Sequence, residues 1–205
     1  MRIAVVGGTG DFGLALARRL VAAGESVVIG SRDAERAREK AAEVGAEGAA
    51  NEDAVRDANL VVLAVKADAA LPTAEALAGA IGETPLLSVA SELRFTKQGV
   101  FPTEDGRSIA ERTQALLRGP VAAGLHSLAA ASLAHGNAEG DALVCGDDER
   151  AKELALELAS KVVAGRAFDA GPLASARALE GMTAVIVNLN RRYKGHAGVG
   201  IVGLP

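Results

Sequence analysis

The chain alternates between short apolar runs and longer stretches in which apolar residues recur every three or four positions. Apolar runs predict β-strands at residues 1–6, 27–29 and 60–65, with a further short strand near residues 46–50. The run at residues 60–65 is continuous, as expected for a parallel strand that is covered on both faces. Later runs predict further strands at residues 86–90, 121–125, 141–145 and 166–169.

The stretches between these runs have the spacing of amphipathic helices. Helices are predicted at residues 14–23, 33–44, 51–57, 68–81, 108–117, 148–162 and 173–192. Residues 91–106 contain Gly99, Pro102 and Gly106 and are predicted to form a long functional loop. The alternation predicts an α/β fold with a doubly wound, mostly parallel sheet. We expect this domain to span residues 1–170, followed by a small helical C-terminal extension at 171–205.

A glycine-rich segment joins the first strand to the first helix and carries the spacing GxGxxG. In this context the spacing is typical of a Rossmann dinucleotide site, because the three glycines allow a tight turn, close approach of backbone amides to a pyrophosphate, and close packing of helix on strand. The pyrophosphate then lies at the positive end of the helix dipole. The residues expected to bind the cofactor here are Gly8, Thr9, Gly10, Asp11, Phe12 and Gly13.

The end of the second strand indicates which dinucleotide binds. An NAD site usually has an acidic residue at this place for the ribose 2′-hydroxyl, whereas this chain has Ser31 and Arg32, with Arg36 one helical turn later. A hydroxyl and two guanidinium groups suit a 2′-phosphate, which favours NADP. Two alternatives remain open: Asp33 can cap the next helix or bind the 2′-hydroxyl, and the arginines can simply be solvated.

Composition excludes several other classes of protein. The 205 residues carry 22 basic and 26 acidic side chains and no Trp, so nothing supports nucleic-acid binding. The single cysteine, Cys145, lies in an apolar run that predicts a buried thiol, and His135 and His196 have no metal-ligand spacing, so we expect no metal. We expect no signal peptide before the first predicted strand, and no apolar run reaches the roughly 18 residues of a membrane helix. A cytoplasmic protein without membrane contact is expected.

Chemically active side chains follow three neighbouring strands. Lys66, Glu92 and His126 come directly after predicted strands, at the sheet edge where such folds bind ligands. Together they form a candidate catalytic group that could protonate a carbonyl or imine as hydride arrives. Each also has a plainer interpretation: Lys66 and Glu92 as surface charges, and His126 as a hydrogen-bonded structural histidine.

Several motifs together resemble the family of F420-dependent NADP oxidoreductases, over the whole length of the chain. They are Gly7-Gly-Thr-Gly10, Gly30-Ser-Arg32, Cys145-Gly-Asp-Asp148, Asp169-Ala-Gly-Pro-Leu173, Asn188-Leu-Asn-Arg-Arg-Tyr-Lys194 and His196-Ala-Gly198. The resemblance implies a Rossmann domain with a small C-terminal part, a homodimer, and hydride transfer between NADP(H) and the deazaflavin coenzyme F420. By the same resemblance NADP would be held by Thr9, Ser31, Arg32 and Arg36.

The resemblance also implies that the deazaflavin lies over the nicotinamide near the carboxyl ends of the strands. Hydride transfer needs two flat rings held about 3–3.5 Å apart and no nucleophile or metal. The cofactor-binding residues expected to line this apolar site, together with Lys66, are Val65, Leu93, Ala129 and Ala130.

The chain departs from the family pattern around the hydride partner. Val65-Lys66-Ala67 stands where the family tends to have Val-Pro-Trp, and Ser91-Glu92-Leu93 stands where it tends to have Asn-Pro-Leu. Two alternative functions therefore stay open. One is an NADPH-dependent reductase or dehydrogenase of another small molecule, such as a pterin, imine or carbonyl compound. The other is a non-catalytic NADP-binding sensor.

The last predicted helix carries two further features. Its apolar stripe is expected in the core or at a dimer contact, and it comprises Leu179, Met182, Val185, Ile186 and Leu189. A basic group at its end is either a solvated helix terminus or a contact for the acidic tail of F420, and it comprises Arg191, Arg192 and Lys194.

Overall fold

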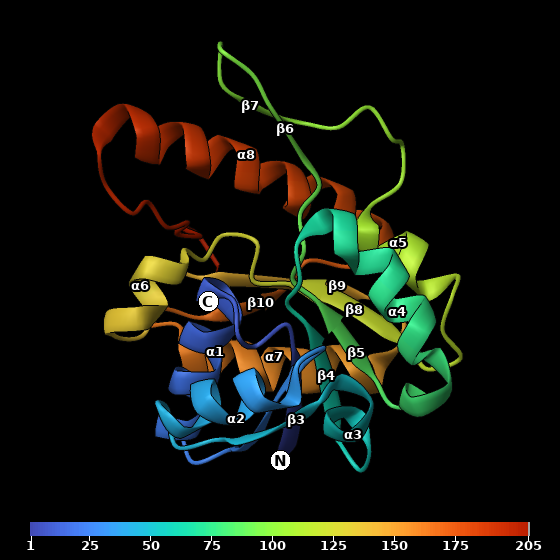
Figure 1. The fold of residues 1–205 in the computed structure, drawn as a ribbon. Helices are drawn as coiled ribbons and strands as arrows, with labels where there is room; N and C mark the ends of the chain where they lie inside the picture. The colour runs from blue at the N-terminus through green and yellow to red at the C-terminus, as the bar shows by residue number, and fades with distance from the viewer. Residues whose placement is uncertain (205) are drawn as a thin grey trace.

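The computed structural model describes residues 1–204, which form an eight-stranded sheet with helices on both faces (Figure 1). The order of strands in the sheet is β10-β9-β8-β5-β4-β1-β2-β3. The strands span Arg2–Val6 (β1), Ser26–Ser31 (β2), Glu47–Ala50 (β3), Leu60–Leu63 (β4), Leu86–Ser88 (β5), Val121–Gly124 (β8), Ala142–Gly146 (β9) and Ala167–Asp169 (β10). Neighbours are parallel except for β8 and β9. The predicted doubly wound, mostly parallel α/β sheet is confirmed.

The helices follow the strands in the alternation that the sequence predicts. They span Asp11–Ala22 (α1), Ala34–Ala42 (α2), Asn51–Val55 (α3), Ala67–Ile81 (α4), Ile109–Gln114 (α5), Ala130–His135 (α6), Glu149–Val162 (α7) and Ala176–Tyr193 (α8), with a 3₁₀ turn at Leu173–Ser175 before α8. Across residues 1–204, every helix is too short or too polar to cross a lipid bilayer.

Two apolar layers cover the sheet, one on each face. Ile3 and Val5 of β1 belong to the layer formed with α1, α2 and α7, whereas Ala4 and Val6 belong to the layer formed with α4 and α5. Successive side chains of a strand point to opposite faces, so burial on both faces explains why these strands read as continuous apolar runs. Cys145 of β9 is fully buried, as predicted, and its burial raises the pKa of the thiol to about 12.

A hairpin and a short helix were absent from the sequence prediction. The expected loop at residues 91–106 contains an antiparallel hairpin of β6 (Leu93–Phe95) and β7 (Val100–Pro102), and α6 forms in the stretch after β8. Strands of three residues and a helix of six are too short to give a readable period. Both are placed by contacts with distant parts of the chain.

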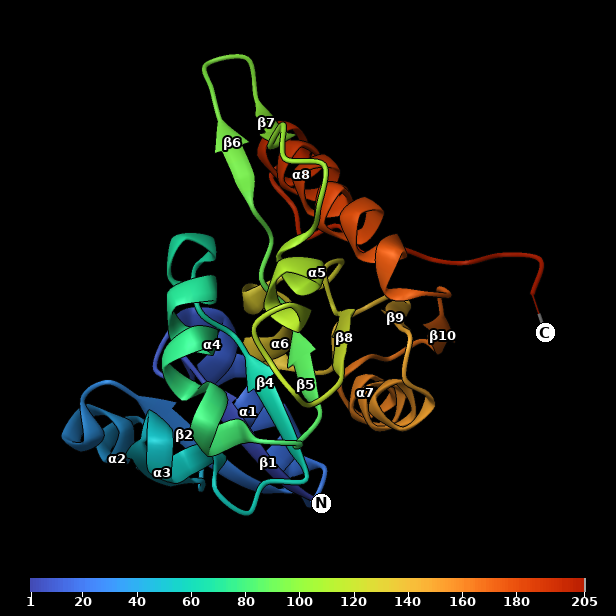
Figure 2. The same cartoon turned by 90° about the vertical axis from the view of Figure 1, so that its right-hand side faces the viewer.

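The hairpin is fastened to α8, and the two stand together above the carboxyl edge of the sheet (Figures 1 and 2). The side chain of Asn188 in α8 binds both backbone groups of Val100: Val100 N donates to Asn188 Oδ1 at 2.8 Å, and Asn188 Nδ2 donates to Val100 O at 2.7 Å. A side chain at Gly99 would have its Cβ 2.9 Å from Asn188 Oδ1. Asn188 therefore fixes the hairpin to the helix.

A buried carboxyl group joins α8 to α5. Glu180 is 2% exposed, and its Oε1 accepts a hydrogen bond from Ile109 N, at the start of α5, at 2.7 Å. Burial raises the pKa of this carboxyl to about 7, although the amides of Ile109 and Ala110 and the charge of Arg112 oppose the shift. A helix start favours negative charge, but here desolvation has the larger effect.

Replacing Glu180 by Gln should therefore change how stability depends on pH. A folded-state pKa above the unfolded value means that the wild-type protein loses stability as pH rises from the unfolded pKa through about 7. Gln keeps an oxygen acceptor for Ile109 N but does not titrate. Between about pH 5 and about pH 8 the wild-type free energy of unfolding should fall by roughly 2 kcal/mol relative to Glu180→Gln. Urea unfolding at both pH values measures this difference, and parallel changes in the two proteins would contradict the assignment.

Candidate functional site

The glycine turn after β1 leaves helix α1 with an open N-terminus. Gly7 has φ +83° and its N–H donates to Gly30 O of β2 at 3.2 Å, which holds the turn against the neighbouring strand. Gly10 is the N-cap residue of α1 and offers no side-chain cap. The amides of a helical first turn have no intrahelical acceptor, so those of Asp11 and Phe12 are available to an anion.

The close packing predicted for this turn is present. A Cβ on Gly13 would lie 2.6 Å from Gly7 O, and a Cβ on Gly8 would lie 2.9 Å from Val5 O. Real Cβ atoms do not approach backbone so closely, so either substitution would force the turn to move. A Cβ on Gly10 would meet only Gly7 O, at 3.4 Å. The turn therefore has one tightly packed side and one open side, and the open side is where a pyrophosphate would lie.

The end of β2 leaves two guanidinium groups available beside this turn. Asp33 is the N-cap of α2, and its Oδ1 accepts hydrogen bonds from Glu35 N at 3.0 Å and Arg36 N at 3.1 Å. Ser31 Oγ in turn accepts from Asp33 N at 3.2 Å. Arg32 and Arg36 are exposed and, within residues 1–204, neither takes part in an ion pair. The carboxylate that could serve a ribose hydroxyl is thus engaged by a helix, while both arginines are free.

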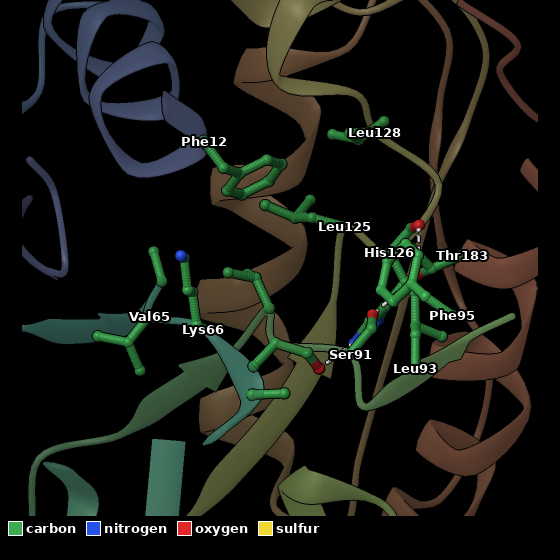
Figure 3. A pocket seen from close by; sticks show the side chains of 14 residues that line it. Phe12, Val65, Lys66, Ser91, Leu93, Phe95, Leu125, His126, Leu128 and Thr183 are labelled. Atoms are coloured by element: carbon green, nitrogen blue, oxygen red, sulfur yellow. Dashed lines mark hydrogen bonds between the residues drawn. The ribbon is translucent and has the colours of Figure 1, made fainter. Parts of the chain in front are cut away.

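A pocket of about 460 Å³ opens at the carboxyl edge of the sheet, between the glycine turn, the strand ends, the hairpin and α8 (Figure 3). Its lining is mostly apolar and consists of Phe12, Ala64, Val65, Lys66, Ala67, Val89, Ala90, Ser91, Leu93, Phe95, Leu125, His126, Leu128 and Thr183. Of the residues expected around the hydride partner, the structure brings together Val65, Lys66, Leu93 and His126. Phe12 joins this pocket to the glycine turn.

Leu125 turns the chain so that the residues after β8 enter the pocket. It has φ +65°, a left-handed conformation that costs a residue with a Cβ roughly 1 kcal/mol. Its backbone is held on both sides, because Leu125 N donates to Leu143 O at 3.3 Å and Leu128 N donates to Leu125 O at 3.0 Å. Strained backbone of this kind gathers at ligand sites. Here it places His126 and Leu128 in the lining.

Lys66 and His126 bring different charges to the pocket. Lys66 is the N-cap residue of α4, is exposed, and is the only lining residue with a charged side chain at neutral pH. His126 is 6% exposed, and burial lowers the pKa of its imidazole to about 4. Its Nε2 lies 3.3 Å from Ala90 O. Since a carbonyl only accepts, Nε2 carries the proton and the ring is neutral.

Three predicted residues lie outside the pocket lining. Thr103 Oγ1 donates to Glu92 Oε2 at 3.1 Å, and Arg112 Nη2 donates to the same oxygen at 2.7 Å. Glu92 is therefore engaged by Arg112 and is not brought together with Lys66 and His126. Ala129 and Ala130 lie at the start of α6, which packs against α1, and neither lines the pocket.

Sequence reasoning missed one polar residue of the pocket. Thr183 of α8 donates from Oγ1 to His126 O at 2.9 Å and lies 2.8 Å from Ser91 Oγ. The only signal in the sequence was a hydroxyl beside the apolar stripe of the last helix. Phe95, Leu125 and Leu128 were missed as well, because apolar residues after strands do not reveal which cavity they line.

Comparisons of the sequence with known proteins indicate one family, and a solved structure shares its fold. Residues 2–92 match the family model described as NADP oxidoreductase, coenzyme F420-dependent. The chain is 37% identical to the F420-dependent NADP reductase of Methanothermobacter thermautotrophicus, covering all of this chain and 96% of the relative. It is 35% identical to the same-named protein of Methanocaldococcus jannaschii, covering 98% and 97%. A crystal structure of a putative F420-dependent NADP reductase from Arthrobacter sp. FB24 superposes over the full length of both chains with a TM-score of 0.84 at 23% identity.

Proposed function

The chain belongs to the family of coenzyme F420-dependent NADP oxidoreductases, and from that membership we propose that it transfers a hydride between NADP(H) and coenzyme F420. The observation that carries the proposal is the apolar pocket that continues from the glycine turn at Phe12 to the hairpin at Phe95. Its volume of about 460 Å³ is within the range of small-molecule sites, roughly 300–1,000 Å³.

The residues at the amino-terminal half of the sheet fit NADP. The open side of the glycine turn, at Gly10, has room for a pyrophosphate next to the first-turn amides of α1. Ser31, Arg32 and Arg36 provide a hydroxyl and two exposed guanidinium groups at the end of β2, which suit a 2′-phosphate. These residues would hold the adenosine half of the cofactor and direct its nicotinamide into the pocket.

Within the pocket, the chain orients two flat rings and excludes water. The chemistry that the bound pair would supply is hydride transfer between C4 of the nicotinamide and C5 of the deazaflavin. Val65, Leu93 and Phe95 offer apolar surface and no competing proton donor, which favours stacked rings over solvent. Lys66 places a positive charge at the pocket, where it would stabilise the negative charge that hydride addition develops on the acceptor ring.

The geometry gives less support to a reductase that protonates a carbonyl or imine. That mechanism needs a group that releases a proton near neutral pH. The candidate group for this role was Lys66, Glu92 and His126 acting together. His126 is neutral because burial lowers its pKa to about 4, and Glu92 is held by Arg112 at 2.7 Å.

We further propose that the chain works as a homodimer in the cytoplasm and that residues 171–205 make the dimer contact. The stripe on α8 divides into two sets: Leu179 and Ile186 are buried, whereas Val185 is 58% and Leu189 is 40% exposed. Tyr193, 73% exposed, follows on the same helix. The lone buried Cys145 fits a reducing compartment. Cell fractionation that places the protein in a membrane or secreted fraction would contradict the location.

The principal test is anaerobic mixing of the enzyme with NADPH and oxidised F420. We expect bleaching of the visible deazaflavin band with one NADPH consumed per F420. The Gly13→Ala variant should lose this turnover by at least about tenfold, because its Cβ would push the Gly7 carbonyl. Gly79→Ala in α4, where the added Cβ would meet no atom within 4 Å beyond the neighbouring backbone of its own helix, is the matched control and should keep it.

Other outcomes of this assay would point to the alternatives. Turnover of NADPH with imine, pterin or carbonyl compounds but not with F420 would favour the small-molecule reductase. NADPH binding without turnover of any of these acceptors would favour the sensor.

Arg32→Ala should weaken the binding of NADPH much more than the binding of NADH. Loss of one guanidinium from a 2′-phosphate should raise the dissociation constant for NADPH by roughly 10- to 100-fold, since charge-assisted hydrogen bonds contribute about 1.5–3 kcal/mol. NADH lacks the phosphate and should change little. Arg38→Ala, on helix α2 that follows Arg32, serves as the control. The chain has no Trp, so calorimetry is the suitable measurement, and equal losses for both dinucleotides would refute the 2′-phosphate site.

The dimer contact predicts a concentration-independent mass of two chains in light scattering at micromolar protein. Leu189→Glu should shift this mass toward one chain, because a charge would be desolvated at the contact. Leu116→Glu is the control and should leave the mass unchanged, because Leu116 is a similarly exposed apolar residue in the turn after α5. A wild-type chain that stays monomeric would refute the proposal.

A further inference from the structure

The hydroxyl of Thr183 has its only proton committed. Its Oγ1 lies 2.9 Å from His126 O, and a carbonyl oxygen can only accept, so the threonine proton points there. Toward its other neighbour, Thr183 Oγ1 can therefore only accept a hydrogen bond. That neighbour is Ser91 Oγ, at 2.8 Å.

The orientation of the serine hydroxyl follows from this. Two oxygens at 2.8 Å share one proton, and Thr183 has none left, so Ser91 must donate to it. Ser91 lines the pocket and therefore offers only oxygen lone pairs there. A serine usually rotates to suit whatever group approaches it, but this one is fixed as an acceptor.

The other side chains on the Ser91 side of the pocket offer a ligand no hydrogen-bond donor. The imidazole of His126 directs its Nε2 proton to Ala90 O, and its Nδ1 is a buried acceptor without a protein partner among the described residues. Leu93 and Phe95, which follow Ser91 in the lining, are apolar. The charged amine of Lys66 lies on the opposite side of the pocket (Figure 3). A bound ring thus meets an accepting wall at Ser91.

We propose that Ser91 is a specificity residue that accepts a hydrogen bond from an amide-type N–H on the edge of a bound flat ring, and that Thr183 fixes it in this role. The inference rests on the proposed function, which supplies two rings with such a group: the carboxamide of nicotinamide and the imide N–H of the deazaflavin pyrimidinedione. A ligand that presents a carbonyl or methyl group at this point leaves the lone pairs of Ser91 unpaired in an apolar pocket, which is costly.

The test uses ligands that lack one N–H at a time. The 3-acetylpyridine analogue of NADP⁺ removes the carboxamide N–H, and N3-methylated deazaflavin removes the imide N–H. We expect the wild-type protein to prefer the parent over one of these analogues by about tenfold or more in kcat/KM. The analogue that is disfavoured identifies which ring donates to Ser91.

Variants connect the preference to the two hydroxyls. Ser91→Ala should bring the preference close to unity by weakening the parent ligand while leaving the analogue unchanged. Thr183→Val should also lower the preference, because Ser91 then loses its acceptor and can rotate to donate to a carbonyl group of the analogue. Thr183→Ser restores that acceptor and should restore the preference. Ser160→Ala, at an exposed site on α7, is the control.

A purely structural role for the Ser91–Thr183 contact gives a different result. Loss of a hydrogen bond between α8 and the segment after β5 would lower activity with parent and analogue alike, and Thr183→Val would then keep the wild-type preference. That result, or a wild-type protein that distinguishes neither analogue, overturns the proposal. Calorimetric binding of NADP⁺ and its acetylpyridine analogue provides the same comparison without turnover. Failure of NADPH to reduce F420 would count against the proposed function separately.

Discussion

The contact between Gly13 in α1 and the Gly7 carbonyl at the end of β1 is the constraint on which the site depends. With no Cβ at Gly13, the first turn of α1 lies directly over the strand end, and a Cβ there would be only 2.6 Å from that oxygen. This closeness aims the open amides of the helix at the sheet edge and brings Phe12 to the pocket wall. Anion binding and ring binding therefore share one geometric origin.

The two halves of the site, the end of β2 and the pocket, differ in the polar groups that they offer a ligand. The end of β2 keeps its guanidinium groups exposed, because Asp33 is used as a helix cap and does not pair with them. The pocket is apolar, and its few polar groups are mostly bound to one another, as in the Ser91–Thr183 pair. Solvated guanidinium groups suit a phosphate, while an apolar pocket with fixed acceptors suits stacked rings. The same sheet edge thus provides two different environments.

The sequence was sufficient to predict features that have a local cause. Periodicity located the strands and long helices, and the glycine spacing located the turn, because both are set by neighbouring residues. The hairpin depends on Asn188, which is 88 residues from Val100, and no local pattern reports such a contact. Glu92 was expected near Lys66, since both follow parallel strands, but Arg112 holds its carboxylate elsewhere. Strand order places a backbone, whereas the direction of a charged side chain depends on its partners.

The burial of Cys145 within β9 has a practical consequence for spectroscopy. Its thiol stays protonated because its pKa is about 12, and thiolate is the form that alkylating dyes attack. A cysteine introduced on the hairpin would consequently be the one thiol in the chain that such dyes label. Because the chain has no tryptophan, its ultraviolet fluorescence is weak. The fluorescence of one tryptophan introduced beside the pocket would therefore report ligand binding without background from other indoles.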